Sequence, residues 1–110
     1  MSDAFRIRSG DDFLLVLEAL SNSYRLLILD KLGERRYYVS ELARELSISR
    51  PLLYLHLQKL EQAGLIDTRL ELSDDGKAMK YVEVKDFNIN ISITGIRSMI
   101  SSLTIKKKGE

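Results

Sequence analysis

Few side chains in this chain could carry out a reaction. Its 110 residues include no cysteine, and His56 is the only histidine. Disulfides, thiolate nucleophiles and metal sites built on cysteines or on two imidazoles are therefore excluded. No base, nucleophile and orienting group occur at a spacing that suggests a catalytic assembly, so we expect neither an enzyme nor a bound metal or other cofactor. What remains is recognition through charge, hydrogen bonds and apolar contact.

Side chains suited to recognition gather in one predicted helix, which begins after Ser49 and tolerates Pro51 in its first turn. Leu53, Leu57 and Leu60 recur at helical spacing and form its buried face. The other face presents Ser49, Arg50, Leu52, Tyr54, Leu55, Gln58 and Lys59. A guanidinium can bind a guanine edge through two hydrogen bonds, a tyrosine hydroxyl can reach a base or a phosphate, and a leucine can meet a thymine methyl group. This face therefore fits the groove of a nucleic acid, although a protein partner would explain the exposed leucines as well.

The overall charge gives less information than this face. The chain has seventeen basic and sixteen acidic residues, but three of the basic residues are Lys106, Lys107 and Lys108 near its end. Residues 1–105 carry a net charge of −1. Proteins that hold nucleic acid by bulk electrostatics are clearly basic, so any such binding must come from a local surface.

Two short helices must position the candidate residues. The first is predicted from Ser40, as its cap, to Leu46, and only three residues separate it from the helix that carries the recognition face. Helices joined by so short a turn cross steeply, and the small side chain of Ala43 permits their close approach. Residues 40–63 are thus predicted to form a helix-turn-helix.

A β-hairpin is predicted directly after it, over residues 65–85. Apolar and polar residues alternate from 66 to 72, which predicts a half-buried strand with Leu70 and Leu72 on its covered face. A turn at 73–76 and a returning strand at 79–85 complete the hairpin. We expect the alternating apolar residues Phe87, Ile89 and Ile91 to extend the same sheet.

The predicted hairpin offers few cations. Lys77 and Lys80, with Arg44 and Lys59 on the helices, are placed for phosphate contacts, which position a protein without specifying a sequence. Asp74 and Asp75 at the turn would repel phosphate, so we predict a solvated tip.

Apolar helices are also predicted at residues 11–20 and 93–104, the second capped by Ser92. They carry more apolar surface than one small core needs, and large exposed patches are rare on monomers. We therefore predict a homodimer whose interface contains Phe13, Leu14, Leu17, Ile96, Met99, Ile100 and Leu103. The alternative is that the first helix packs on the last within one chain.

Another helix is predicted between these elements, capped by Ser21 or Asn22 and ended by Gly33. Its apolar residues are Leu26, Leu27, Leu29 and Leu32. A brief extended piece follows at 37–39.

Residues 17–86 resemble the winged-helix repressors of the ArsR type. The matching segments are LEALSNSYRLLILDKL, VSELARELSIS and RPLLYLHLQKLEQAGLI, followed by a strand, a turn and a strand. The pair His56-Leu57 followed by LEQAGLI is the most specific fragment. The resemblance implies an α+β winged helix-turn-helix, a single domain over residues 1–110 with a helical core, a β-hairpin wing at 65–85 and dimerisation helices at both ends.

The resemblance also implies a function, that of a dimeric, sequence-specific regulator that binds double-stranded DNA and represses transcription by occluding a promoter. Founding members sense metals through cysteines on the helix before the turn, where this chain has residues 41–45, ELARE. Others use histidines and carboxylates on the last helix, where this chain has Arg97, Ser98, Ser101 and Ser102. The metal-sensing residues are absent, and only the DNA-binding half of the family's function is expected here.

Two other functions stay open. A winged helix that contacts proteins of the transcription machinery would suit the balanced charge and the exposed Leu52 and Leu55. A regulator that responds to a small ligand would hold it near the dimer helices.

We expect a structural role for His56 and a solvated lysine tail. The apolar runs are too short to span a membrane and the first residues lack a signal-peptide core, so we expect a cytoplasmic protein with no membrane partner.

Overall fold

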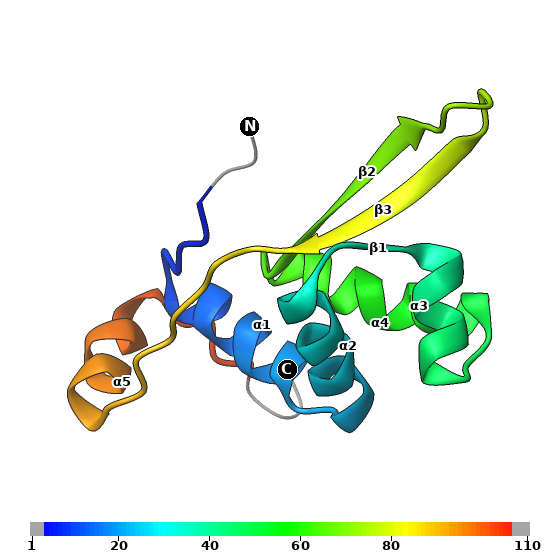
Figure 1. Cartoon of the computed structure of the whole chain (residues 1–110). Coiled ribbons are helices and arrows are strands. Elements are labelled where there is room, and N and C mark those ends of the chain that lie inside the picture. The colour runs from blue at the N-terminus through cyan, green and yellow to red at the C-terminus, as the bar shows by residue number, and fades with distance from the viewer. Residues whose placement is uncertain (1–3, 107–110) are drawn as a thin grey trace.

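The computed structural model describes residues 4–106 and places helices around the base of a small antiparallel sheet (Figure 1). The elements in chain order are α1 (Gly10–Leu20), α2 (Ser23–Glu34), β1 (Tyr37–Tyr38), α3 (Val39–Leu46), α4 (Arg50–Gln62), β2 (Ile66–Leu72), β3 (Ala78–Val84), α5 (Ile93–Met99) and the 3-10 turn η1 (Ile100–Ser102). The hairpin β2–β3 projects away from the helices, and α5 lies at the opposite end of the molecule. No helix in the described part of the chain is long and apolar enough to cross a membrane.

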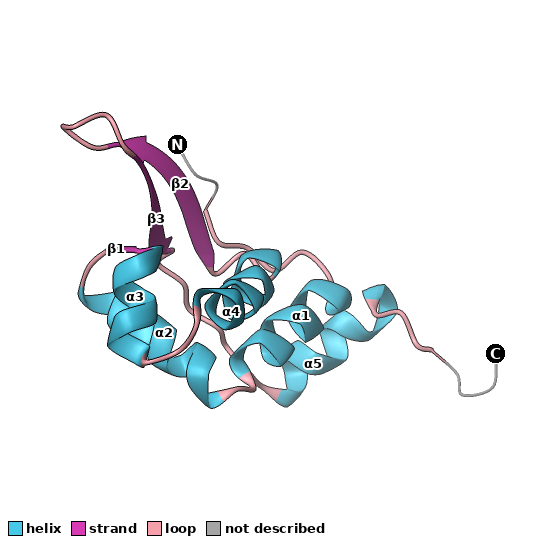
Figure 2. Ribbon diagram, turned by 90° about the vertical axis from the view of Figure 1, so that its right-hand side faces the viewer, coloured by secondary structure: helices cyan, strands magenta, loops and turns pink. Residues whose placement is uncertain are grey.

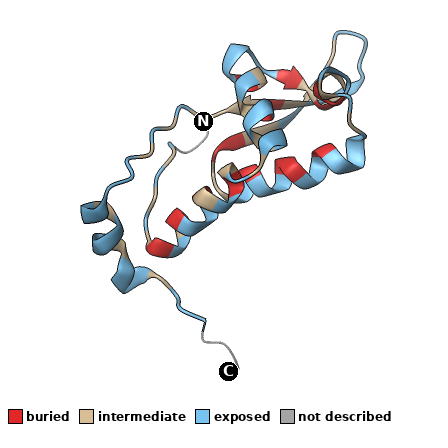
Figure 3. Cartoon of the chain, turned by 90° about the horizontal axis from the view of Figure 1, so that it is seen from below, coloured by how far each residue is buried: buried red, intermediate tan, exposed pale blue. Residues whose placement is uncertain are grey.

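The core lies where α1–α4 meet β1 and the base of the hairpin. Helical periodicity directs one apolar face of each helix into it, and Ile28, Leu42 and Leu53 are fully buried there. Ile66 and Val82 close the core from the sheet. Figure 3 shows the buried residues concentrated in this part of the molecule, whereas the last helix before the C-terminus is exposed.

Polar side chains cap four of the helices: the sequence predicts Asn22, Ser49 and Ser92, and Ser9 caps α1 in addition. Asn22 Oδ1 accepts a hydrogen bond of 3.1 Å from the Arg25 amide, and Ser92 Oγ accepts one of 3.0 Å from the Gly95 amide. Helix α3 differs, because it begins at Val39 and not after Ser40. The chain enters this helix directly from β1, and Glu41 Oε1 accepts the Tyr38 amide at 3.0 Å. The prediction of Ser40 as the cap is therefore wrong.

Helix α2 corrects two further details. Gly33 keeps a helical conformation and the helix ends one residue later, at Glu34, so Gly33 does not end it. Leu26 and Leu27 are about half exposed, because four consecutive apolar residues cannot all face inward and Ile28 takes the buried position. Leu32 is buried, as predicted.

The sheet has the strand order β1-β3-β2, with β3 antiparallel to both neighbours. Near the base, Ile66 pairs with the half-buried Val84. Leu70 and Leu72, in the outer half, are 72% and 77% exposed. Their predicted burial is wrong, because no described helix covers the part of the hairpin that extends beyond α4.

Residues 85–92 do not extend the sheet, contrary to the prediction. After β3 the chain runs across the molecule towards α5 and pairs with no strand over these residues (Figure 1). Phe87 and Ile89 pack on the core from outside the sheet, and Ile91 is 60% exposed. Their alternation reflects an extended segment with one side against the core.

The two ends of the described chain meet where the start of α1 contacts the turn η1, which follows α5 (Figure 2). The Gly10 amide donates a hydrogen bond of 2.8 Å to Ser102 Oγ, and the amide of Thr104 donates one of 2.7 Å to Asp11. The start of α1 therefore contacts, within one chain, the turn η1 and Thr104, which lie in the segment predicted as the last helix. Lys107 and Lys108 of the tail lie outside the described residues.

Helices α3 and α4 with the hairpin β2–β3 thus form a winged helix-turn-helix, and the predicted α+β fold is confirmed.

Candidate nucleic-acid interface

The turn between α3 and α4 fixes the direction of α4. Ser47 has a left-handed conformation with a φ of 54°, and the amide of the next residue, Ile48, donates a hydrogen bond of 3.1 Å to Ala43 O. Leu42 and Leu53, one from each helix, belong to the same buried cluster. Helix α4 therefore packs through one face and leaves the other face to solvent.

The start of α4 has the serine cap and the proline in its first turn that the sequence predicts. Ser49 Oγ accepts a hydrogen bond of 3.3 Å from the Leu52 amide, and Pro51 occupies the first turn. Because a serine hydroxyl that caps a helix keeps its own proton, Ser49 can still donate to a base or a phosphate. Its side chain is exposed, which leaves it accessible for such a contact.

All seven predicted contact residues of this helix and its cap lie at the surface: Ser49, Arg50, Leu52, Tyr54, Leu55, Gln58 and Lys59. Leu55 is the most exposed of the three large apolar or aromatic ones, at 61%, compared with 39% for Leu52 and 41% for Tyr54. Leu53, Leu57 and Leu60 are buried. The outward face of α4 is thus available over its whole length.

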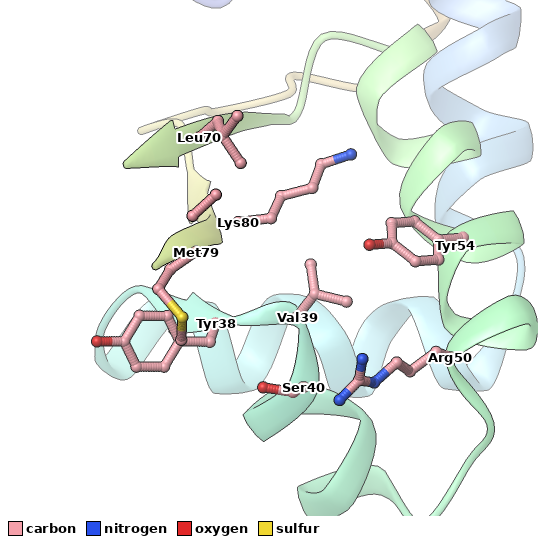
Figure 4. Close-up of a pocket in the computed structure, with 9 residues that line it drawn as sticks. Tyr38, Val39, Ser40, Arg50, Tyr54, Leu70, Met79 and Lys80 are labelled. Carbon is pink, nitrogen blue, oxygen red and sulfur yellow. The ribbon is translucent and has the colours of Figure 1, made fainter. Parts of the chain in front are cut away.

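A groove of about 370 Å³ separates the start of α4 from the wing (Figure 4). Its lining residues are Tyr38, Val39, Ser40, Arg50, Tyr54, Leu70, Ala78, Met79 and Lys80. Lys80 and Tyr54 reach towards one another from β3 and α4, with the ammonium nitrogen 5.0 Å from the ring centroid. Arg50 extends towards Ser40 at the start of α3. Two cations, Arg50 and Lys80, and three hydroxyl groups therefore surround one hollow.

The wing contributes charge unevenly. Lys77 and Lys80 are both exposed, but the ammonium group of Lys77 lies 4.0 Å from Asp75 at the tip, whereas Lys80 points towards α4. Ser73 Oγ donates a hydrogen bond to the Asp75 carboxylate, which keeps the pKa of Asp75 below its ordinary value. The tip therefore carries carboxylates, and Lys80 is the wing cation that lies at the groove.

Two adjacent arginines that the sequence leaves unassigned stabilise the wing and α3. Arg36 Nη1 lies 2.7 Å from Glu71 and 3.6 Å from Glu83, and its guanidinium stacks 3.8 Å above the ring of Tyr81. The hydrogen bond to Glu71 raises the pKa of Arg36 above its ordinary value. Arg35 pairs in the same way with Glu41 at 3.3 Å. Both cations therefore bind acidic residues of the chain itself.

Of the four predicted phosphate contacts, Arg44, Lys59, Lys77 and Lys80, only Lys80 lines the groove. Lys80 lies in the groove, and Arg44 and Lys59 are exposed on α3 and α4. Four further residues line the groove that were not among the predicted contacts: Tyr38, Ser40, Leu70 and Met79. For one of them a signal exists, because Leu70 pairs directly with Lys80 in the hairpin and therefore faces the same side of the sheet.

The predicted dimer residues divide into three groups: exposed, half-buried and buried. Leu14, Ile96 and Ile100 are 45%, 38% and 51% exposed, and Leu17, Met99 and Leu103 are half-buried. Phe13 is only 9% exposed within one chain, so little of its side chain is left for a second subunit.

Among residues 4–106 no three His, Asp or Glu side chains converge in a way that could hold a metal ion.

Comparison with known proteins agrees with this geometry. Residues 22–68, from the cap of α2 into β2, match the model of the arsR family of bacterial regulatory proteins. Over 91 residues, the chain is 36% identical to an HTH-type transcriptional regulator of Methanocaldococcus jannaschii, covering 83% of this chain and 95% of that protein. The chain belongs to the ArsR family.

Solved structures of the family are similar to this one. HlyU of Vibrio cholerae is 27% identical, with a TM-score of 0.60 and coverage of 84% of this chain and 87% of that chain. A homodimeric winged helix-turn-helix DNA-binding domain of Mycobacterium bovis, a possible ArsR-family transcriptional regulator, is 28% identical, with a TM-score of 0.62 and coverage of 69% of this chain and 66% of that chain. This ArsR-family chain thus shares its central fold with both.

Proposed function

We propose that this chain is a homodimeric regulator of transcription that binds specific sequences in double-stranded DNA and represses by occluding a promoter. The observation that carries the proposal is the exposed outer face of α4, with Arg50 and Tyr54 at a groove that the wing closes on its other side. The proposal assigns the protein no catalytic role and no cofactor, and it places the protein in the cytoplasm with its DNA.

The start of α4 would read bases. A recognition helix places its N-terminal residues against base edges in the major groove, and Ser49, Arg50 and Tyr54 are those residues here. Arg50 supplies the fork of donors that a guanine edge accepts. Leu55, which follows Tyr54, offers apolar contact for a thymine methyl group. Leu52 and Gln58 are also exposed on α4 and would contact the DNA as well.

The cations around this helix would hold the DNA backbone. Lys80 enters from the wing, Arg44 from α3 and Lys59 from the second half of α4, so that phosphates on both sides of the groove meet a positive charge. Lys77 would contribute less, because Asp75 lies beside it and carries the opposite charge.

A second copy of the chain would cover the exposed apolar residues of α1 and α5. Leu14 lies in α1 and Ile100 begins the turn η1 that follows α5, and the contacts of Gly10 and Asp11 hold the start of α1 against this turn and Thr104. The M. bovis domain with the same fold is described as homodimeric. A two-fold dimer sets two recognition helices about one helical turn of DNA apart, roughly 10 base pairs, and requires a palindromic site.

Selection of bound duplexes from a random DNA pool tests the proposal. We expect the wild-type protein to recover a palindrome with half-sites about 10 base pairs apart from centre to centre. The Arg50→Ala variant should recover a palindrome that is degenerate at the base pair that Arg50 contacts in each half-site. A pool that stays random after repeated rounds with the wild type would contradict the proposal and would favour a protein partner for Leu52 and Leu55.

A further inference from the structure

His56 is the only buried polar or charged side chain among the described residues. It lies in the middle of α4, on the side that faces away from the groove, and is 9% exposed. The ring of Tyr24, at the start of α2, stacks on the imidazole with 5.8 Å between the centroids. The proposed DNA contacts of α4 do not use this histidine, so its position calls for another explanation.

Arg25 of α2 connects this histidine to the end of α1. Its Nε donates a hydrogen bond of 2.6 Å to Ala19 O, its Nη2 donates one of 3.1 Å to Glu18 O, and its Nη1 lies 3.3 Å from His56 Nδ1. The last carbonyl groups of a helix have no partner within the helix and attract cations. Helix α1 has no basic residue in its own last turn, and Arg25 supplies the charge from outside.

The chemistry of the guanidinium determines the state of the imidazole in this contact. An arginine has only donors, so Nδ1 of His56 must be the acceptor and must carry no proton. The proton of the neutral ring then lies on Nε2. An imidazolium would instead direct an N–H group and a positive charge at Arg25, which the contact cannot accommodate.

We propose that Arg25 is a positioning residue, which fixes the orientation of the recognition helix α4 relative to the dimer helix α1 through His56. This inference rests on the proposed function, because it assigns α4 to the DNA and α1 to the dimer interface.

Rigid attachment matters because each subunit has its own recognition helix. The distance between the two helices in a dimer depends on how α4 is oriented relative to the helices at the interface. Apolar packing between α1 and α4 has no directional preference, whereas the planar guanidinium makes its hydrogen bonds in a fixed geometry. The three contacts of Arg25 therefore supply the directional part of the connection and set the half-site spacing that the dimer accepts.

Spacing preference is the functional measurement. The palindrome recovered from the random pool is compared with duplexes whose half-sites are moved apart or together by one base pair. For the wild type we expect a loss of affinity of about tenfold or more at the altered spacing, because one recognition helix leaves its register. For Arg25→Lys, which keeps the charge but cannot make the three contacts at once, we expect the loss to shrink to within about threefold.

Matched variants separate this role from general stability. Arg69→Lys, on the exposed outer surface of the wing, should keep the wild-type preference. His56→Asn places an acceptor oxygen near the position of Nδ1 and should also keep it, whereas His56→Leu removes the acceptor and should behave as Arg25→Lys does. Thermal unfolding of each variant shows that it is folded at the temperature of the binding experiment.

The outcomes distinguish this inference from the proposed function. If the wild type recovers no sequence, both are overturned. If the wild type binds its palindrome and Arg25→Lys keeps the full spacing preference, only the inference is overturned. Nitrogen NMR of the DNA-free protein gives an independent result, since a neutral His56 with its proton on Nδ1 would also contradict the contact.

Discussion

The backbone amide of Gly10 donates a hydrogen bond of 2.8 Å to the hydroxyl of Ser102, although 92 residues separate them in the chain. The approach is so close that a Cβ atom on Gly10 would lie 2.5 Å from Met99 O and 2.8 Å from Leu103 Cβ. Asp11 adds hydrogen bonds from the amide and the hydroxyl of Thr104, which lower its pKa below the ordinary value. The start of α1 and the segment from Met99 to Thr104 therefore form one unit.

Gly10→Ala should disrupt this unit. In an ordinary helix position the change stabilises by about 0.5–1 kcal/mol, but here the added methyl group must displace the backbone at Met99. We expect a lower melting temperature and a weaker dimer in sedimentation equilibrium. Gly33→Ala is the control, because a Cβ there meets no atom within 4 Å, and it should raise stability. Similar behaviour of the two variants would show that the close approach has no effect.

Ile100→Asp should separate the subunits while leaving each one folded. Ile100 is 51% exposed in the single chain, so a carboxylate there stays hydrated in the monomer but would be buried without a partner in the dimer. We expect sedimentation to show monomers, with an unchanged circular dichroism spectrum. Leu72→Asp at the exposed end of the wing is the control and should remain dimeric. A dimer that persists in Ile100→Asp would place the interface elsewhere.

The sequence predicts which residues are buried in α4 better than it predicts which are buried in the wing. The reason is that the core covers one face of α4 along its length but covers only the base of the hairpin. In α4 the buried Leu53, Leu57 and Leu60 follow from helical periodicity, since the helix rests on the core along its length. In β2 the alternation of Leu70 and Leu72 is equally regular, yet both are exposed because the strand is longer than the helix face beneath it. Alternation indicates which side chains share a face but not whether another element covers that face.

The contacts that hold the candidate site in place were beyond prediction for a different reason. Arg25 meets His56 across 31 residues, and Arg36 meets Glu71 across 35. Such pairs have no local signature, because their partners come together only when the helices and the wing have packed. The sequence therefore indicated which residues of α4 face outward, whereas the residues that orient α4 and the wing emerged only from the structure.

Arg50→Ala should weaken specific DNA binding most among single changes on α4. Loss of a guanidinium that binds a base edge through two hydrogen bonds costs about 1–3 kcal/mol and relaxes the preference at one base pair. The measurement is a titration of the selected palindrome and of the same duplex mutated at each position. Arg69→Ala, which removes an exposed arginine from the wing surface away from the groove, is the control and should bind as the wild type does. Equal affinity of the Arg50 variant and the wild type would place base recognition on other residues.

Lys80→Ala should weaken binding to all sequences alike. The ammonium group lies at the groove beside Tyr54, where a DNA phosphate would release a counterion on binding. We expect the slope of log affinity against log salt to fall by about one for each subunit that loses the contact. Lys77→Ala should change the slope less, because Asp75 already lies near that lysine. A loss of affinity confined to one base sequence would indicate that Lys80 contacts a base.

The stability of the protein should depend on pH through His56. Burial, and then the charge of Arg25, lower the pKa of His56 below its ordinary value of 6.5. Between these two pKa values the unfolded chain binds a proton that the folded chain does not, so the free energy of unfolding must fall as the pH falls. The stabilisation is fully present above about pH 6.5 and is lost as the pH drops through the lower, folded-state pKa. Asp11, Glu41 and Asp75 also have lowered pKa values, but their ordinary values of 3.8–4.5 place their effect in more acidic solution.

Urea unfolding at pH 7.5, 6.5 and 5.5 should therefore show a declining free energy of unfolding for the wild type. His56→Asn, whose side chain cannot be protonated in this range, should show little change. Equal declines in the two proteins would show that another group titrates in this range. They would contradict a neutral His56 in contact with Arg25.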